Sequence, residues 1–135
     1  MPARYLLDTN IASYIIKRNI PEVRRRLGRH AMSEIAISSV TEGELSYGLS
    51  RNPAATRLRV IVEEFLLRVT ILPWDSDAAR QYGQLRAMLE HGGQPMGNLD
   101  LMIAAQAMAA GLTLVTNDRA FARIKGLKIQ DWTKP

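Results

Sequence analysis

Short apolar runs along the chain alternate with longer stretches in which apolar residues recur at helical spacing. The short runs predict strands over residues 4–7, 35–38, 69–72, 112–116 and 127–130. The longer stretches predict helices over residues 11–18, 21–29, 40–50, 54–68, 77–91 and 99–110. This alternation is typical of an α/β fold, in which helices cover a parallel sheet. Ligands of such sheets bind at the carboxyl ends of the strands, so we expect the chemistry there.

The composition limits the class of protein. A chain of 135 residues has the length of one domain, which we take to span residues 1–135. Apolar residues make up 47% and charged residues 23% of the chain, which excludes collagen-like, low-complexity and extensively disordered structures. The absence of cysteine excludes a disulfide scaffold and a thiolate metal site, and it fits a cytoplasmic protein. No apolar stretch reaches the roughly 20 residues of a spanning helix, so we expect no membrane segment.

The chain is basic, with 18 lysine and arginine residues against 13 acidic residues and a formal net charge of +5. Fourteen of the 18 basic residues are arginine, whose planar guanidinium group suits phosphate. The charge is therefore compatible with a polyanionic partner such as a nucleic acid, although a basic surface without a partner explains it equally well.

Two aspartates follow predicted strands. Asp8 comes directly after the first strand, and Asp118 comes after the fourth. Because the carboxyl ends of parallel strands meet at one edge of the sheet, both side chains are expected at that edge. Each aspartate could instead serve only to cap the helical turn that follows it.

Glu44 belongs to the helix predicted over residues 40–50. At about 100° per residue, Glu44 falls inside an apolar arc that includes Tyr47, whereas Glu42 falls at the edge of this arc. A carboxylate on an inward face must be paired or must bind a cation, because burying a free charge is costly. The alternative is a purely structural role, since Ser39 and Glu42, like Thr41 and Glu44, have the spacing of a capping box.

Asp100 stands at the start of an almost wholly apolar and therefore buried helix, where an acid also complements the helix dipole. With Asp8, Glu44 and Asp118 it completes a set of four acids, each expected near the carboxyl edge of the sheet. Like charges in such a cluster repel one another and need compensation. In a chain without cysteine, the natural compensation is a hard divalent cation with oxygen ligands, such as Mg²⁺ or Mn²⁺.

Four motifs occur in order along nearly the whole chain. They are Leu7-Asp8-Thr9-Asn10, Ser38-Ser39-Val40-Thr41-x-x-Glu44-Leu45-x-Tyr47-Gly48, Gly97-x-x-Asp100-x-x-Ile103-Ala104 and Thr116-Asn117-Asp118-x-x-Phe121. Each motif alone is weak, but all four at these spacings are specific. On these motifs the chain resembles the PIN-domain ribonucleases, and within them the VapC toxins of type II toxin–antitoxin modules. The resemblance implies a PIN fold, with a parallel sheet of about five strands, and RNA cleavage that depends on Mg²⁺, for which Mn²⁺ can substitute.

The resemblance also assigns roles to residues. The acidic positions of the family, which are catalytic and hold the metal directly or through water, match Asp8, Glu44, Asp100 and Asp118. Thr116 matches a supporting hydroxyl position, and we expect Thr9 and Thr116 to fix the rotamers of the carboxylates. In one departure, many relatives carry asparagine immediately before the third acid, where this chain has Leu99. No role is therefore carried over to Asn98.

Arginine side chains must supply affinity for RNA, because the acidic pocket itself repels phosphate. Arg86 is the first candidate, since its helix leads into the loop before Asp100, although a solvated helix face explains it as well. The expected substrate is tRNA or another structured RNA. The resemblance further implies a homodimer and a VapB-like antitoxin that occludes the pocket. Two amphipathic helices, over residues 54–68 and 77–91, add apolar surface for a dimer.

Three other functions fit parts of this pattern. A PIN-like DNA nuclease would keep the same four acids, and only substrate assays separate it from a ribonuclease. A phosphoryl-transfer enzyme with a strand-end aspartate nucleophile would usually show a second aspartate two positions after Asp8, where this chain has Asn10. A non-catalytic domain that binds nucleic acid or protein would be expected to lose acids of the set, and none is missing.

Overall fold

The computed structural model describes residues 2–135. In this part of the chain, five short strands form one sheet in the order β3-β2-β1-β4-β5, and all neighbouring strands are parallel. The strands are β1 (Tyr5–Leu7), β2 (Ile35–Ser38), β3 (Thr70–Leu72), β4 (Thr113–Val115) and β5 (Ile129–Gln130). The predicted α/β class and the parallel sheet of five strands are confirmed.

Helices connect the strands. The α-helices of residues 2–135 are α1 (Thr9–Lys17), α2 (Pro21–Leu27), α3 (Ser39–Arg51), α4 (Thr56–Arg68), α5 (Ser76–His91) and α6 (Asn98–Ala110). Two short 3₁₀ helices, η1 (Met32–Glu34) and η2 (Arg119–Arg123), were not predicted as helices. Each predicted α-helix is present, with ends that differ by at most two residues.

The ends of elements depend on backbone hydrogen bonds that apolar spacing does not reveal. Val69 was predicted to begin the third strand, but its N–H donates to the carbonyl of Phe65 and so ends α4. Helix α1 begins earlier than predicted, because Asp8 accepts a hydrogen bond from the N–H of Ile11 and thereby caps a helix that starts at Thr9. The apolar pattern of the sequence therefore locates the helices and strands but not the residues at which they begin and end.

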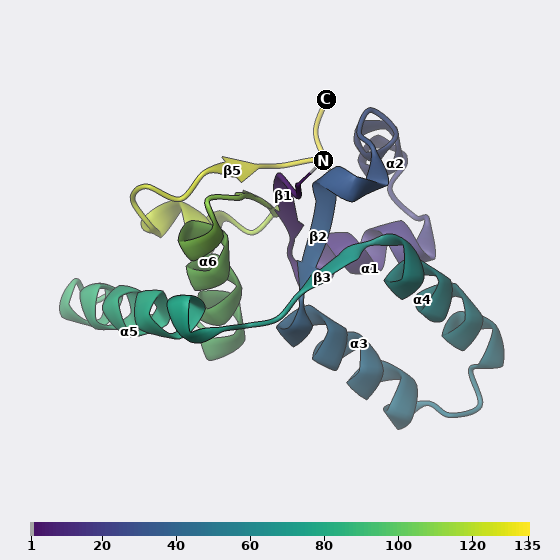
Figure 1. The fold of residues 1–135 in the computed structure, drawn as a ribbon, viewed down its shortest axis with the longest axis horizontal. Coiled ribbons are helices and arrows are strands. Elements are labelled where there is room, and N and C mark those ends of the chain that lie inside the picture. Colours follow the sequence, from purple (N-terminus) through teal and green to yellow (C-terminus); the bar gives the residue numbers. More distant parts are fainter. Residues whose placement is uncertain (1) are drawn as a thin grey trace.

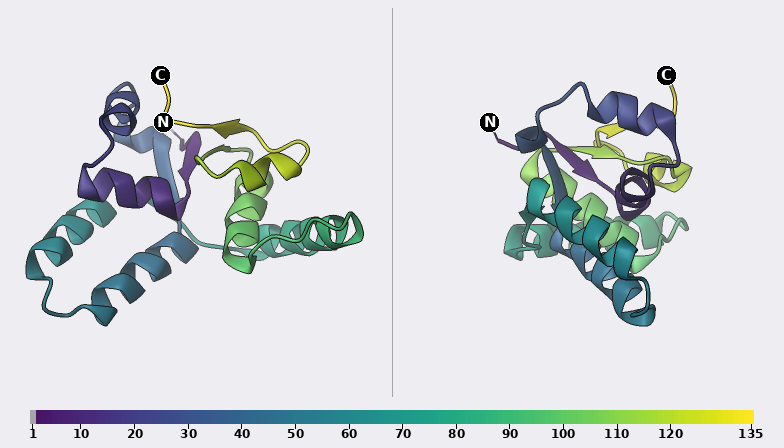
Figure 2. Two further views of the ribbon diagram at one scale, coloured as in Figure 1. Left: turned by 180° about the vertical axis from the view of Figure 1, so that it is seen from behind. Right: turned by 90° about the vertical axis from the view of Figure 1, so that its right-hand side faces the viewer.

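The order of the strands places the site. The chain builds outward from β1 to β2 and β3, returns through α5 and α6, and then adds β4 on the other side of β1. Figures 1 and 2 show α1, α2 and α4 on one side of the sheet and α5 and α6 on the other. The direction of winding thus reverses between β1 and β4, and the carboxyl ends of two such strands flank the crevice where ligands bind in open α/β sheets.

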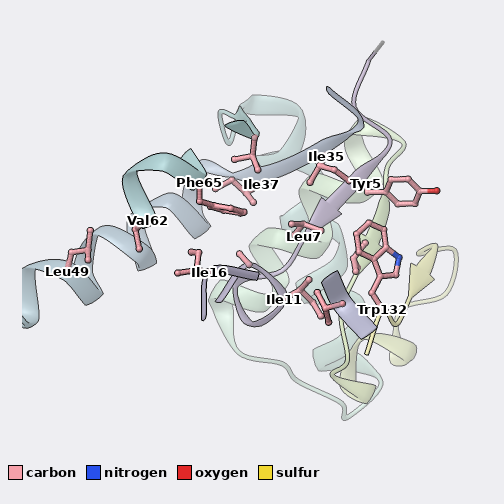
Figure 3. Packing of buried hydrophobic residues seen from close by; sticks show 14 residues of the cluster. Tyr5, Leu7, Ile11, Ile16, Ile35, Ile37, Leu49, Val62, Phe65 and Trp132 are labelled. Atoms are coloured by element: carbon pink, nitrogen blue, oxygen red, sulfur yellow. The ribbon is translucent and has the colours of Figure 1, made fainter. Parts of the chain in front are cut away.

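The two faces of the sheet bury separate apolar clusters, because successive side chains of a strand point to opposite faces. Tyr5 and Leu7 of β1 pack with residues of α1, α2 and α4, and Figure 3 shows Phe65 and Trp132 in this cluster. Leu6, between them in sequence, packs on the opposite face with α5 and α6. Burial on both faces explains why β1 is an uninterrupted apolar run.

Helices α4 and α5, whose amphipathic pattern suggested a dimer surface, lie on opposite faces of the sheet (Figure 2). They therefore do not form one continuous apolar surface, and the homodimer stays a prediction. Leu67 of α4 nevertheless leaves 86% of its area exposed, and Val60, two turns earlier on the same helix, is exposed as well. No helix within residues 2–135 combines the length and the apolar character that crossing a membrane requires.

Candidate active site

The fold brings the predicted acids to the carboxyl edge of the sheet. Asp8 directly follows β1, and Asp118 lies three residues after the end of β4, the strand that pairs with β1. Asp100 is in the first turn of α6, and Glu44 is in α3, which begins where β2 ends. The charge of Asp8 interacts with those of Asp100 and Asp118, and the charge of Asp100 interacts with those of Asp118 and Glu44. The four carboxylates therefore form one electrostatic cluster.

Asp8 is the most buried acid of the cluster, with 4% of its area exposed. One carboxylate oxygen accepts a hydrogen bond from the N–H of Ile11 at 2.9 Å, and the other accepts one from the hydroxyl of Thr116. Burial raises the pKa of Asp8 from 3.8 to about 6. The two hydrogen bonds lower the pKa, and the charges of Asp100 and Asp118 raise it. Asp8 is thus a helix cap, as the structural alternative proposed, and also a member of the charged cluster.

Thr116 links the ends of β1 and β4. Its buried hydroxyl donates to Asp8 and accepts a hydrogen bond from the backbone N–H of Asp118 at 3.0 Å. Asp118 itself is exposed, and its carboxylate caps η2 by accepting from the N–H of Ala120 at 2.9 Å. Thr116 therefore orients one acid directly and fixes the backbone of the other.

Glu44 is half-buried and is held by a side chain of α1. The hydroxyl of Thr9 donates to Glu44 Oε1 at 2.6 Å, and the same hydroxyl lies 3.0 Å from the hydroxyl of Thr41. The capping boxes that the spacing allowed do not form. The side chain that caps α3 is Ser38, and the Ser39 hydroxyl accepts from the N–H of Trp74.

The helical wheel was wrong about Tyr47, whereas Glu44 is half-buried, as Glu42 also is. Tyr47 leaves 65% of its area exposed, and its ring lies under the guanidinium of Arg51 at 5.5 Å. The buried residues of α3 are Thr41 and Leu49, because α3 projects beyond the sheet and only part of its apolar arc is covered (Figure 1). A wheel gives the angle of a residue but not the extent to which neighbours cover the helix.

Asp100 is half-buried, and its pKa is raised above the usual 3.8 by burial and then by the charges of Asp118 and Glu44. Leu99, at the position where many relatives carry asparagine, leaves about half of its side chain exposed, and Asn98 is exposed as well. No hydrogen bond within the described residues joins the side chain of Asn98 to the cluster.

Within the described residues, no positive side chain compensates the charge of the cluster. Among residues 2–135, neither lysine nor arginine forms an ion pair with any of the four acids. In the same part of the chain, no three His, Cys, Asp or Glu side chains are arranged so that they already enclose a metal ion. An ion bound here would therefore have few direct protein ligands and would keep several waters, which is the usual situation for Mg²⁺. The cluster fits a hard cation, because its carboxylates have no basic partner among residues 2–135 and the pKa values of Asp8 and Asp100 are raised.

Arg86 is exposed on α5, where it pairs with Glu90 at 2.9 Å and donates to the hydroxyl of Tyr82 at 3.1 Å. These contacts are those of a solvated helix face, and the contact of Arg86 with RNA stays a prediction. Sequence reasoning missed the contact of the Thr41 hydroxyl with the hydroxyl of Thr9, which donates to Glu44. The position of Thr41 three residues before Glu44, on the same face of a helix, was the signal that could have indicated it.

Sequence reasoning also missed a groove between α1, α2 and α4. It has a volume of about 460 Å³, and its walls combine apolar side chains with three arginines. Representative lining residues are Ile15, Leu27, Ile61, Arg18, Arg24 and Arg68. The groove depends on the packing of α4 beside α1 and α2, which are distant from it in sequence, so no local pattern predicts it.

Comparison with known proteins gives the family. The PIN domain model matches residues 5–127. The chain is 40% identical over 131 residues to the tRNA(fMet)-specific endonuclease VapC of Shigella flexneri, covering 96% of this chain and 98% of the relative. It is 38% identical to Ribonuclease VapC2 of Haemophilus influenzae, with the same coverage of each chain. A DNA-bound VapBC complex from Salmonella typhimurium contains a chain with 40% identity and a TM-score of 0.90, covering 96% and 98% of the two chains.

These matches and the arrangement of the acids define a class of protein. The chain belongs to the PIN-domain family. Within that family it is similar, over nearly its whole length, to the VapC ribonucleases of toxin–antitoxin systems, as the four motifs suggested.

Proposed function

We propose that this chain is a metal-dependent endoribonuclease toxin that hydrolyses phosphodiester bonds of RNA. The observation that carries the proposal is the cluster of four carboxylates at the switch point of the sheet, which has no basic partner among residues 2–135. The names of relatives at about 40% identity, which are endonucleases or ribonucleases, support the same activity.

The metal is proposed to be Mg²⁺, with Mn²⁺ as a substitute, held by Asp8, Glu44, Asp100 and Asp118 directly or through water. When bound, such an ion neutralises phosphate charge and lowers the pKa of a coordinated water. The pKa values of Asp8 and Asp100 are raised first by burial and, to a lesser extent, by the charges of neighbouring acids. This second contribution supports the proposal, because a cation would relieve the repulsion between the carboxylates.

The side chains around the cluster have distinct tasks in this proposal. Thr116 and the N–H of Ile11 hold Asp8 in one rotamer, and Thr9 does the same for Glu44. Fixed carboxylates need no reorganisation when the substrate arrives, which favours the transition state. Asp118 is exposed at the rim of the cluster and is the acid with most access to an attacking water. The products expected from this hydrolysis carry 5′-phosphate and 3′-hydroxyl ends.

The proposed substrate is tRNA or another structured RNA. The name of the Shigella flexneri relative specifies a tRNA substrate for that protein, and the net charge of +5 suits a polyanion. Arg86 remains the first arginine to test for RNA contact. It is exposed, and its partner Glu90 lies on the same helix, so an RNA phosphate can compete for it.

We propose a VapB-like antitoxin as the protein partner, since similar chains occur in VapBC complexes from Salmonella typhimurium and Rickettsia felis. The groove between α1, α2 and α4 has the composition to take an apolar segment with acidic flanks. It is lined by aliphatic side chains, and its three arginines (Arg18, Arg24 and Arg68) outnumber its single acid, Glu64. A homodimer and a cytoplasmic location complete the proposal.

The test is cleavage of purified tRNA by the purified chain, with single-stranded DNA of matched sequence as the second substrate. We expect cleavage of RNA with Mg²⁺ or Mn²⁺ and none in excess EDTA. The products should accept a 5′ label from a kinase only after phosphatase treatment, because their 5′ ends carry phosphate. Cleavage of DNA and not of RNA would favour the DNA nuclease alternative. Absence of cleavage of both, with tRNA bound, would favour a non-catalytic binding domain.

A further inference from the structure

We propose that Thr41 is a positioning residue whose hydroxyl holds the hydroxyl of Thr9 in the orientation in which it donates to Glu44. The proposal rests on the function proposed above, because it concerns how a candidate metal-binding carboxylate is held. Within residues 2–135 no hydrogen bond joins Thr41 directly to an acid of the cluster, so Thr41 acts through Thr9.

The direction of the hydrogen bonds follows from counting protons. A threonine hydroxyl has one proton to donate and lone pairs with which to accept, whereas an ionised carboxylate only accepts. The proton of Thr9 is therefore committed to Glu44 Oε1, at an oxygen–oxygen distance of 2.6 Å. The hydroxyl of Thr41 lies 3.0 Å from that of Thr9, and because Thr9 has no second proton, Thr41 must be the donor. Donation runs from Thr41 to Thr9 and from Thr9 to Glu44.

Packing alone does not explain a threonine at position 41. The side chain is fully buried, with 0% of its area exposed, and in the described part of the chain its hydroxyl is hydrogen-bonded to Thr9 alone. Valine has nearly the same shape and would avoid the cost of burying a hydroxyl group. The bond to Thr9 offsets that cost, and burial deprives the Thr41 hydroxyl of water as an alternative partner.

The relay joins two elements of the site. Thr9 is the first residue of α1, directly after Asp8, whereas Thr41 and Glu44 stand one turn apart on the same side of α3. The two hydroxyls therefore fix Glu44 of α3 relative to the helix start that carries Asp8. Without Thr41, Thr9 can rotate away from Glu44 and bond to water, since Thr9 is only half-buried.

The test is the affinity of the whole chain for Mn²⁺ in the absence of RNA, measured from the electron paramagnetic resonance signal of free Mn²⁺. We expect Thr41→Val to weaken binding about fivefold, which corresponds to the loss of one net hydrogen bond. Thr41→Ser keeps the hydroxyl and should bind Mn²⁺ like the wild type. The control is Ser39→Ala on the same helix, because the hydroxyl of Ser39 accepts from Trp74 and contacts no carboxylate; its Mn²⁺ affinity should not change.

A double-mutant cycle separates the relay from a general effect on the fold. Thr9→Val should weaken Mn²⁺ binding about tenfold, as is typical for residues that orient a metal ligand. Thr41→Val should cause no further loss in that background, because the residue through which it acts is gone. If Thr41→Val does not fold, Thr41→Ala provides the same comparison.

Three results would overturn the proposal: wild-type affinity in Thr41→Val, failure of Thr41→Ser to restore binding, or equal losses from Thr41→Val with and without Thr9. If the wild-type chain binds no Mn²⁺ and cleaves no RNA, the proposed function fails and this inference fails with it. A wild type that binds and cleaves, beside an unaffected Thr41→Val, contradicts the relay alone.

Discussion

Replacing Asp8 with asparagine should inactivate the protein and yet stabilise it in the absence of metal. Asparagine keeps the size of aspartate and an oxygen that can accept from the N–H of Ile11, so α1 remains capped. The change removes the charge that burial and the neighbouring acids disfavour. A charge that is required for activity can thus be a cost to the fold.

The magnitude follows from the pKa of Asp8. A rise from 3.8 to about 6 means that ionised Asp8 costs the folded state about 3 kcal/mol at neutral pH. Asparagine also disturbs the hydrogen bond from Thr116, at a cost of about 1 kcal/mol. The net gain of about 2 kcal/mol should raise the melting temperature by about 6 °C for a domain of this length.

The pH dependence distinguishes relief of charge from other effects. Because the pKa is raised in the folded state, the cost of ionisation is absent below pH 3.8, grows between pH 3.8 and about 6, and is complete above that range. The advantage of Asp8→Asn should therefore shrink on acidification. At pH 4 the protonated wild type keeps its bond from Thr116 and should be at least as stable as the variant.

The assay is thermal unfolding followed by circular dichroism at pH 7.5 and pH 4, in EDTA and with Mg²⁺, beside an RNase assay. The control is Asp75→Asn, because Asp75 caps α5 by the same bond, at 3.0 Å from Ala78 N, but is exposed. This control should gain no stability. Saturating Mg²⁺ should reduce or reverse the difference in melting temperature between Asp8→Asn and the wild type, because the wild type gains more binding energy from the ion. An apo variant no more stable than wild type at pH 7.5, or an advantage that persists at pH 4, would refute the electrostatic reasoning.

Three further outcomes are expected. Glu44→Gln should abolish RNA cleavage and Glu42→Gln should not, because the Thr9 hydroxyl donates to Glu44, whereas no side-chain hydrogen bond within residues 2–135 reaches the carboxylate of Glu42; a damaging Glu42→Gln would contradict this assignment. Cleavage should need Mg²⁺ or Mn²⁺, while Ca²⁺ should bind without turnover because it accepts looser and longer coordination; full activity in excess EDTA would refute the metal mechanism. Sedimentation at micromolar concentration should give a dimer, and a monomer would count against the exposed apolar side of α4 as a contact between copies.

The strand-end acids could be predicted from the sequence because two local facts sufficed. An apolar run ends at Leu7 and another before Thr116, and parallel strands bring their carboxyl ends to one edge. The pairing of β1 with β4, by contrast, depends on the fold of the whole chain, because the hydrogen bond from Thr116 to Asp8 joins residues 108 positions apart. The spacing of apolar residues does not predict that β1 pairs with β4. Only the resemblance of the motifs to a known family pointed to this pairing.

The parts that could not be predicted depend on which surfaces other helices cover. Tyr47 belongs to an apolar arc by its angle, but α3 projects from the sheet and leaves it exposed. The apolar pattern around Thr41 does not distinguish it from other helical residues. Its proposed role depends on Thr9 of α1, whose hydroxyl lies 3.0 Å from the hydroxyl of Thr41. The groove between α1, α2 and α4 has the same origin.

The most direct test of the central claim is the rate of tRNA cleavage at saturating Mg²⁺ for the wild type, Asp100→Asn and Asp75→Asn. Both substitutions change an aspartate at the start of a helix, but only Asp100 interacts with the other acids of the cluster. We predict that Asp75→Asn cleaves like the wild type and that Asp100→Asn loses at least about 100-fold in rate. Wild-type cleavage by Asp100→Asn would contradict the account.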